Sequence, residues 1–116
     1  MDVGAYSPLS ARVKTDGGAS ATVFASATGS RWNLKGAVIA WANLAGDVAV
    51  SLYEFNATNS TVFFSFNATT SSGMYAFNFA DFGIPASSSY ASRLVFNAAT
   101  VAGTFSGLFT GYQTGG

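Results

Sequence analysis

Apolar and polar residues alternate along the middle of the chain. The run at residues 48–55 shows the pattern best, because single smaller or polar residues separate Val48, Val50 and Leu52. Side chains that alternate with a period of two point to opposite faces of a β-strand. The apolar runs before and after it have the same period, and turn-forming residues separate the three. This part of the chain is therefore predicted to be a meander of antiparallel strands.

The same alternation extends over most of the sequence. It predicts seven strands, at residues 21–28, 34–42, 48–55, 61–67, 74–82, 90–97 and 101–112. No long stretch shows a helical period. Short strands at this spacing are typical of a β-sandwich or a small barrel. We predict an all-β fold, an antiparallel β-sandwich of seven or eight strands, with the jelly roll as the preferred topology.

Two strands carry patterns that say more about their packing. In the run at residues 34–42, strict alternation places Leu34 on the same face as Val38, and Ile39 on the opposite face. On one face of the last strand large and small residues alternate, and Gly103 and Gly107 are the small ones. Glycine inside a strand often marks a bend or the close approach of another backbone.

The chain is expected to form one domain with a distinct beginning and end. Residues 1–20 are predicted to be an N-terminal arm, because Pro8 favours an extended backbone and Asp16 begins a turn signal with two glycines. This arm either frays or docks as a strand on the body or on a neighbouring copy. Residues 21–112 are predicted to be the β-sandwich domain, and residues 113–116 a flexible tail.

Charge is scarce throughout the sequence. Only 9% of the residues are charged, five basic and five acidic, and the formal net charge is zero. An ordinary soluble domain has about 25%. Such a chain has little electrostatic protection against self-association, which suggests that much of its surface is covered in its working state. The scattered basic residues argue against nucleic acid as a partner.

The apolar runs are also informative about membranes and export. The longest, at residues 36–42, is far shorter than the roughly 20 residues that a membrane-spanning helix needs. The N-terminus lacks the basic segment and apolar core of a signal peptide. We therefore expect no membrane association.

Residue types that carry most enzyme chemistry are missing. The sequence has no histidine and no cysteine, which excludes the usual catalytic triads, thiolate metal sites and disulfides. A glycosidase mechanism needs two facing carboxylates, for which Glu54 and Asp81 are the candidate pair. We expect them instead to be solvated or salt-bridged. The prediction is no catalysis, no cofactor and no metal.

Aromatic and asparagine residues suggest two other sites. Exposed aromatic rings on a sandwich face could stack on sugars, and the candidates are Trp32, Trp41, Tyr53, Tyr75 and Tyr90. Aromatic residues in strands more often fill the core, which is the interpretation favoured here. Three glycosylation triplets begin at Asn56, Asn59 and Asn67. They arise readily by chance in a sequence rich in Asn, Ser and Thr, and they matter only in a secreted eukaryotic protein.

The order of segments from Arg31 onward resembles that of small bacteriophage virion proteins with a jelly-roll fold. The segments are GAVIAWAN, GDVAVSLYEF, STVFFSFNATTSSGMYAFNFADFGIP and YASRLVFNAATVAGTFSGLFTGY. The charge-poor, cysteine-free composition is also similar to that of capsid cement and decoration proteins. The resemblance implies a homotrimer on the capsid surface that binds the major capsid protein and reinforces the joints between capsomers.

We therefore expect a non-enzymatic structural protein of a virus particle, most specifically a capsid cement or decoration protein. The alternatives are a carbohydrate-binding or adhesion module, and a tail or fibre component of a virion. Contact with the capsid or with a neighbouring copy is expected from the N-terminal arm. The candidate contact residues are Tyr6, Pro8, Leu9 and Val13.

Overall fold

The computed structural model describes residues 7–16, 20–26, 28–56, 59–79, 83–88, 91–99 and 103–115. In these residues the regular structure consists of nine β-strands, and no helix is present. The strands are β1 (Ser7–Asp16), β2 (Ser20–Ala25), β3 (Ser30–Ala42), β4 (Val48–Asn56), β5 (Asn59–Ala68), β6 (Gly73–Asn78), β7 (Ile84–Pro85), β8 (Ser92–Ala99) and β9 (Thr104–Gly115).

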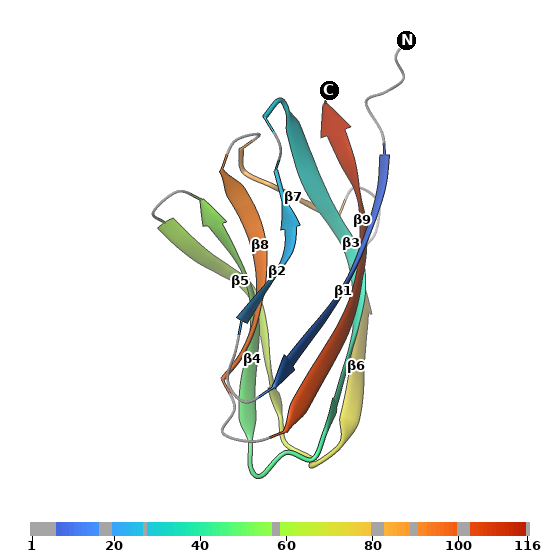
Figure 1. The fold of residues 1–116 in the computed structure, drawn as a ribbon, viewed down its shortest axis with the longest axis vertical. Coiled ribbons are helices and arrows are strands. Elements are labelled where there is room, and N and C mark those ends of the chain that lie inside the picture. The colour runs from blue at the N-terminus through green and yellow to red at the C-terminus, as the bar shows by residue number, and fades with distance from the viewer. Residues whose placement is uncertain are drawn as a thin grey trace.

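The strands form two antiparallel sheets that pack face to face (Figure 1). The first sheet has the order β1-β9-β3-β6, and the short β7 pairs with β3. The second sheet has the order β2-β8-β4-β5. Most connections along the chain cross from one sheet to the other, which is the arrangement of a jelly roll. The predicted all-β sandwich is confirmed.

Alternating side chains fill the space between the sheets. Val48, Val50 and Leu52 of β4 are buried, as the period of two predicts. Phe96 of β8 faces Phe109 of β9 from the other sheet, with ring centroids 5.8 Å apart. Burying one such ring contributes about 3 kcal/mol. The aromatic content of the sequence thus serves mainly as the core.

The prediction that Leu34 lies on the same face as Val38 is wrong, because β3 contains a bulge. Leu34 pairs with Gly111 and Gly36 pairs with Thr110, so Lys35 is an extra residue between them. An extra residue reverses the parity of a strand. Leu34 therefore points inward with Ile39, although they lie five positions apart, while Val38 points outward. The simple alternation of apolar and polar residues in a sequence does not reveal a bulge of this kind.

The arm and tail predicted at the ends are strands where the structure describes them. All ten residues of β1 pair with β9, and Leu9 and Val13 pack against the core, so residues 7–16 belong to the sandwich. The strand β9 continues to Gly115, beyond the tail boundary expected at Gln113. β9 supplies the partner of β1, and the end of β9 pairs with β3 as far as Gly115.

Other boundaries shift by a few residues. β3 begins at Ser30, earlier than expected, and β6 ends at Asn78, before the expected residue 82. Phe79 lies just after β6, and its backbone N–H donates to the carbonyl of Lys35 at 2.7 Å. The two residues of β7 form an additional short strand, which pairs with β3.

The glycines of β9 allow close packing. A Cβ at Gly111 would lie 1.9 Å from the carbonyl oxygen of Asn33 on the neighbouring strand. A Cβ at Gly107 would lie 2.5 Å from the ring of Phe109. The expected close approach of another backbone is found at Gly111, whereas Gly107 leaves room for the ring of Phe109. β3 and β9 form the centre of the first sheet.

Candidate docking surface

The outward face of the first sheet presents exposed apolar side chains at its centre. Strand register aligns its outward residues in rows, and one row runs from Arg12 through Leu108 and Val38 to Ala76. Val38 is 40% exposed and Leu108 is 38% exposed. These two large apolar side chains are direct partners on neighbouring strands and form a ridge across the middle of the sheet.

A second row lies beside the first. It runs from Lys14 through Ser106 and Ala40 to Met74, which is 68% exposed. In both rows the basic residue lies at the β1 edge and the remaining residues are uncharged. We refer to these two rows as the docking face, which consists of Arg12, Leu108, Val38, Ala76, Lys14, Ser106, Ala40 and Met74.

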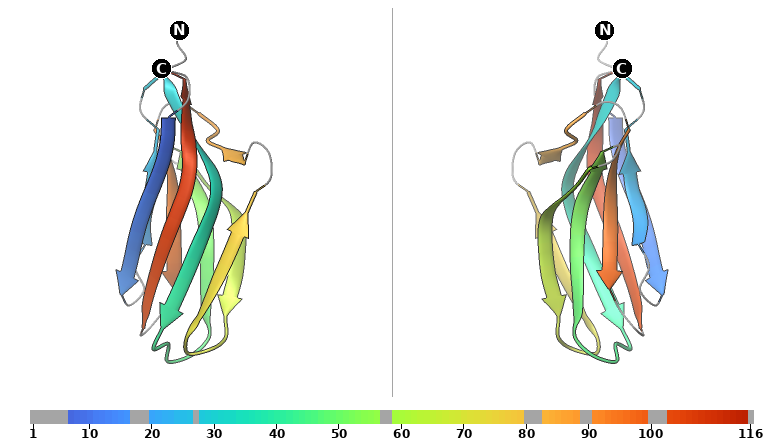
Figure 2. Two further views of the ribbon diagram at one scale, coloured as in Figure 1. Left: turned by 90° about the vertical axis from the view of Figure 1, so that its right-hand side faces the viewer. Right: turned by 90° about the vertical axis from the view of Figure 1, so that its left-hand side faces the viewer.

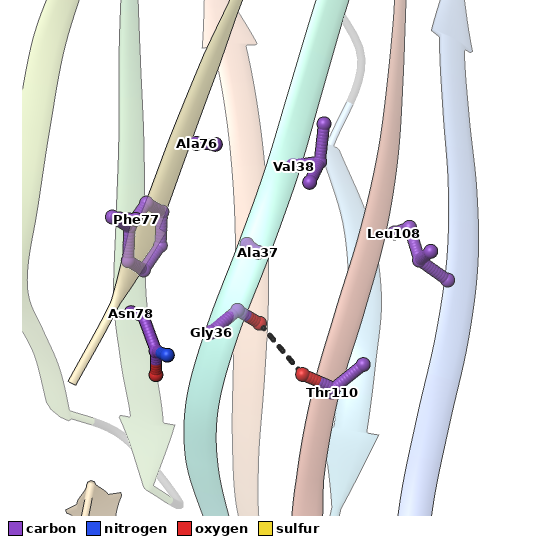
Figure 3. Close-up of a pocket in the computed structure, with 8 residues that line it drawn as sticks. All are labelled: Gly36, Ala37, Val38, Ala76, Phe77, Asn78, Leu108 and Thr110. Carbon is purple, nitrogen blue, oxygen red and sulfur yellow. Dashed lines mark hydrogen bonds between the residues drawn. The ribbon is translucent and has the colours of Figure 1, made fainter. Parts of the chain in front are cut away.

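Two shallow hollows flank the ridge. The first, of about 420 Å³, extends over β6, β3 and β9 and is shown in Figure 3. It forms because Gly36 has no side chain and Ala76 has only a methyl group, and Thr110 Oγ1 donates to the Gly36 carbonyl at 3.5 Å along its floor. The second, of about 470 Å³, lies between the two rows and is bordered by Arg12 and Lys14. This relief suits shape-complementary docking.

The side chains of the docking face are suited to contact with a partner. Arg12 and Lys14 are the charged side chains among the described residues that line the two hollows. No described acidic side chain lines either hollow, so the face has no acid–base pair. Within the described ranges, no group of three or more His, Cys, Asp or Glu side chains could hold a metal ion.

A different part of the molecule contains a cluster of aromatic rings. Phe64 and Phe66 of β5 meet Tyr75 and Phe77 of β6 where the two sheets end on the same side of the sandwich. The ring centroids of Phe64 and Phe77 are 4.4 Å apart, and those of Phe66 and Tyr75 are 4.6 Å apart. We call these four residues the edge aromatic cluster.

Glu54 joins two segments close to one end of β4. Its Oε2 atom accepts hydrogen bonds from the backbone N–H of Ser87 at 2.9 Å, from Ser87 Oγ at 2.7 Å and from Ser92 Oγ at 2.5 Å. Burial raises the pKa of the Glu54 carboxyl, but the hydrogen bonds from Ser92 and Ser87 outweigh it and leave the pKa below the ordinary 4.5. The group is therefore a fixed acceptor. Asp81, its proposed catalytic partner, lies outside the described residues.

Of the residues predicted to contact a partner, the three that the structure describes do not share one surface. Pro8 is exposed, whereas Leu9 and Val13 point toward the core of their own chain. Tyr6 lies outside the described residues. The sequence analysis did not predict Val38, Leu108 and Met74 as contact residues. The available signal was the run at residues 36–42, which is apolar on both faces, as in strands that are covered on both sides.

The proposed sugar-stacking residues are mostly engaged in packing. Trp32 is 1% exposed, and Trp41 packs on Phe66 and Phe105 while its Nε1 donates to the carbonyl of Thr70 at 3.1 Å. Tyr75 is 40% exposed, but its ring packs on those of β5.

The remaining candidates differ in their exposure. Tyr53 is half-buried, and Tyr90 lies outside the described residues. Asn59 and Asn67 are exposed, whereas the side-chain amide of Asn56 donates to Ser87 Oγ at 2.9 Å.

Two further findings complete the description. In the described part of the chain, no helix is long and apolar enough to cross a membrane. Comparisons of the chain with models of protein families, with curated proteins and with solved structures gave no match.

Proposed function

We propose that the protein is a non-enzymatic structural protein of a virus particle, a capsid cement or decoration protein. In this proposal it docks on the major capsid protein through the docking face. The observation that carries the proposal is the exposed ridge of Val38 and Leu108, which lies on a sheet whose opposite face is already core. Large exposed apolar surfaces on a folded domain are typical of interaction sites.

The electrostatics of the chain support the same function. The centres of protein interfaces are depleted in charge, and here the centre of the docking face is uncharged while Arg12 and Lys14 lie at its border. A chain with 9% charged residues and no net charge is suited to a crowded, covered position. The resemblance of its segments to small virion proteins indicates the capsid surface as that position. Attachment at many equivalent lattice sites would raise the stability of the shell.

The test is binding to capsids assembled from the major capsid protein of the same genome. We expect the purified chain to co-sediment with these capsids and to raise the temperature at which they disassemble. Leu108→Lys places a charge on the ridge and is expected to weaken binding about tenfold or more. Ala49→Lys is the matched control, because Ala49 is exposed on the outward face of the second sheet.

Two outcomes of this experiment would contradict the proposal. Failure of the wild-type chain to bind these capsids would overturn the proposal of a cement protein. Equal weakening by Leu108→Lys and Ala49→Lys would overturn the assignment of the docking face. Thermal melts of both variants show whether each is folded before binding is compared.

A further inference from the structure

The two lateral sides of the sandwich differ in how their edge strands are protected. Natural edge strands are commonly protected by charged residues, by proline or by short length, because an unprotected edge can pair with another chain. On one side, β1 carries Pro8, Arg12 and Lys14, and β2 has six residues and a bulge at Val23. β1 and β2 also lie against each other, so this side is closed (Figure 2).

The opposite side, formed by β5 and β6, has none of these charged or proline residues. Figure 2 shows these two strands together on the side away from β1 and β2. β5 is ten residues long, and the sequence contains no charged residue and no proline from residue 55 to residue 80. Each strand ends its sheet and has no strand partner on its outer edge among the described residues.

Exposed apolar side chains lie along the same side. Val62 of β5 is 59% exposed and Met74 of β6 is 68% exposed. Between them lies the edge aromatic cluster, in which Tyr75 is 40% exposed. The rings of this cluster pack on one another, with Phe64 and Tyr75 stacked at 5.8 Å, so their faces are largely occupied. A flat partner that covers the cluster fits this geometry better than a sugar that must stack on a free ring face.

We infer that the β5–β6 side is a contact between two copies of this chain, in which β5 of one copy pairs antiparallel with β5 of the other about a two-fold axis. Two identical antiparallel strands are self-complementary about such an axis. Pairing would satisfy the outer N–H and C=O groups of β5 and bring the two edge aromatic clusters together.

The charge distribution favours a second copy as the occupant. The described residues of β5 and β6 carry no charge that would select an oppositely charged partner, and a chain of zero net charge does not repel its own copies. The bulge at Phe63 interrupts the regular pattern of β5, so residues from Phe64 to Ala68 provide the regular edge.

A two-fold pair differs from the trimer that the resemblance implies. A ring of three uses two different surfaces on each copy, one for each neighbour. Here the long edge strand without charge or proline, β5, lies on one side, and the opposite side carries Arg12 and Lys14 on β1. The inference rests on the proposed function only in expecting copies to associate, and it uses residues outside the docking face except Met74 and Ala76 of β6.

The first test measures molar mass by light scattering over a dilution series. The wild-type chain is expected to have about twice the mass of 11.9 kDa at high concentration and to dissociate on dilution. Ser65→Lys places two lysines close together across the two-fold axis, and we expect it to raise the dissociation constant about tenfold or more. Thr22→Lys, at the opposite edge of the same sheet, is expected to leave it unchanged.

The second test uses the absence of cysteine in the chain. Ser65→Cys is a nearly isosteric change at an exposed position, so it keeps the fold and provides one thiol for a short bis-maleimide cross-linker. Covalent pairs are expected from Ser65→Cys and not from Thr22→Cys. A single-copy mass at all concentrations, a mass of three copies, or equal cross-linking of both variants would overturn the inference.

The experiments distinguish failure of the proposed function from failure of the proposed contact between copies. Leu108→Lys is expected to lose capsid binding and still form the pair. Ser65→Lys is expected to dissociate the pair and still bind capsids as single copies. If the chain pairs but does not bind capsids, the proposed function is wrong while the contact between copies stands.

Discussion

At the scale of single residues, Glu54 connects segments that are far apart in the sequence. Its carboxylate accepts hydrogen bonds from Ser87 and from the fully buried Ser92. Ser92 begins β8, and Ser87 lies in the segment before it, so one side chain of β4 positions both. A charged acceptor makes stronger hydrogen bonds than a neutral one.

This contact predicts a pH-dependent contribution to stability. The folded-state pKa of Glu54 lies below the ordinary 4.5, so its stabilising effect is complete above that value and is lost as the pH falls through the lowered folded value. Glu54→Gln is expected to lower the free energy of unfolding by about 1 kcal/mol at pH 7, a modest amount because the site is near the surface.

Urea denaturation of both chains at pH 7 and pH 3 checks this prediction. The difference between wild type and Glu54→Gln should shrink at the lower pH, because the unfolded wild-type chain then binds a proton at Glu54 and folding must work against it. Comparing the two chains cancels the titration of the other carboxylates. A difference that stays constant from pH 7 to pH 3 would show that the charge of Glu54 is irrelevant to stability.

At the scale of elements, the bulge at Lys35 decides which side chains of β3 enter the core. Before it, Trp32 and Leu34 point inward, and after it Ala37 and Ile39 do so. The two halves of the strand therefore have opposite parity and a common inner face. A one-residue change of register moves every following side chain to the other face of the sheet.

Deletion of Lys35 is therefore expected to keep cooperative unfolding, because it removes the extra residue and leaves Leu34 two positions before Ala37, on the same face of a regular strand. Deletion of Val38 is the matched comparison, because it makes Ala37 and Ile39 direct neighbours, which cannot both point inward. Near-ultraviolet circular dichroism during heating distinguishes the two, and a cooperative thermal transition is expected from the Lys35 deletion alone. Loss of that transition in the Lys35 deletion would contradict this role of the bulge.

At the scale of the whole molecule, the first strand completes the sandwich. β1 pairs with β9 along its full length, Leu9, Ala11 and Val13 pack on the core, and Thr15 is 2% exposed. An arm that only contacted a partner could be removed without loss of the fold. A strand whose own inward side chains pack against the core cannot be removed in this way.

Removal of residues 1–16 is accordingly expected to unfold the protein or to cause aggregation through the uncovered edge of β9. The full-length variant Arg12→Gln with Lys14→Gln, which keeps the strand and removes its charges, is expected to retain a cooperative thermal transition. Thermal melts followed by circular dichroism make the comparison. If the truncated chain melted at the wild-type temperature, β1 would be shown to add little to stability.

The local pattern of the sequence determined much of this protein. Alternation in residues such as Val48, Val50 and Leu52 was sufficient to predict strands and a sandwich, because side-chain direction in a strand depends on neighbouring residues alone. The absence of histidine and cysteine likewise removed whole classes of chemistry. The glycines of the last strand indicated close packing before any partner was known.

Only the tertiary structure decided which apolar residues form the core and which remain exposed. Arg12, Val38, Ala76 and Leu108 lie far apart in the sequence and form one row because three pairings between strands align them. The inward position of Leu34 depends on a bulge, and the β5–β6 side exists because β5 and β6 each end a sheet. Register, bulges and edges arise from long-range pairing, which the local periodicity of a sequence does not encode.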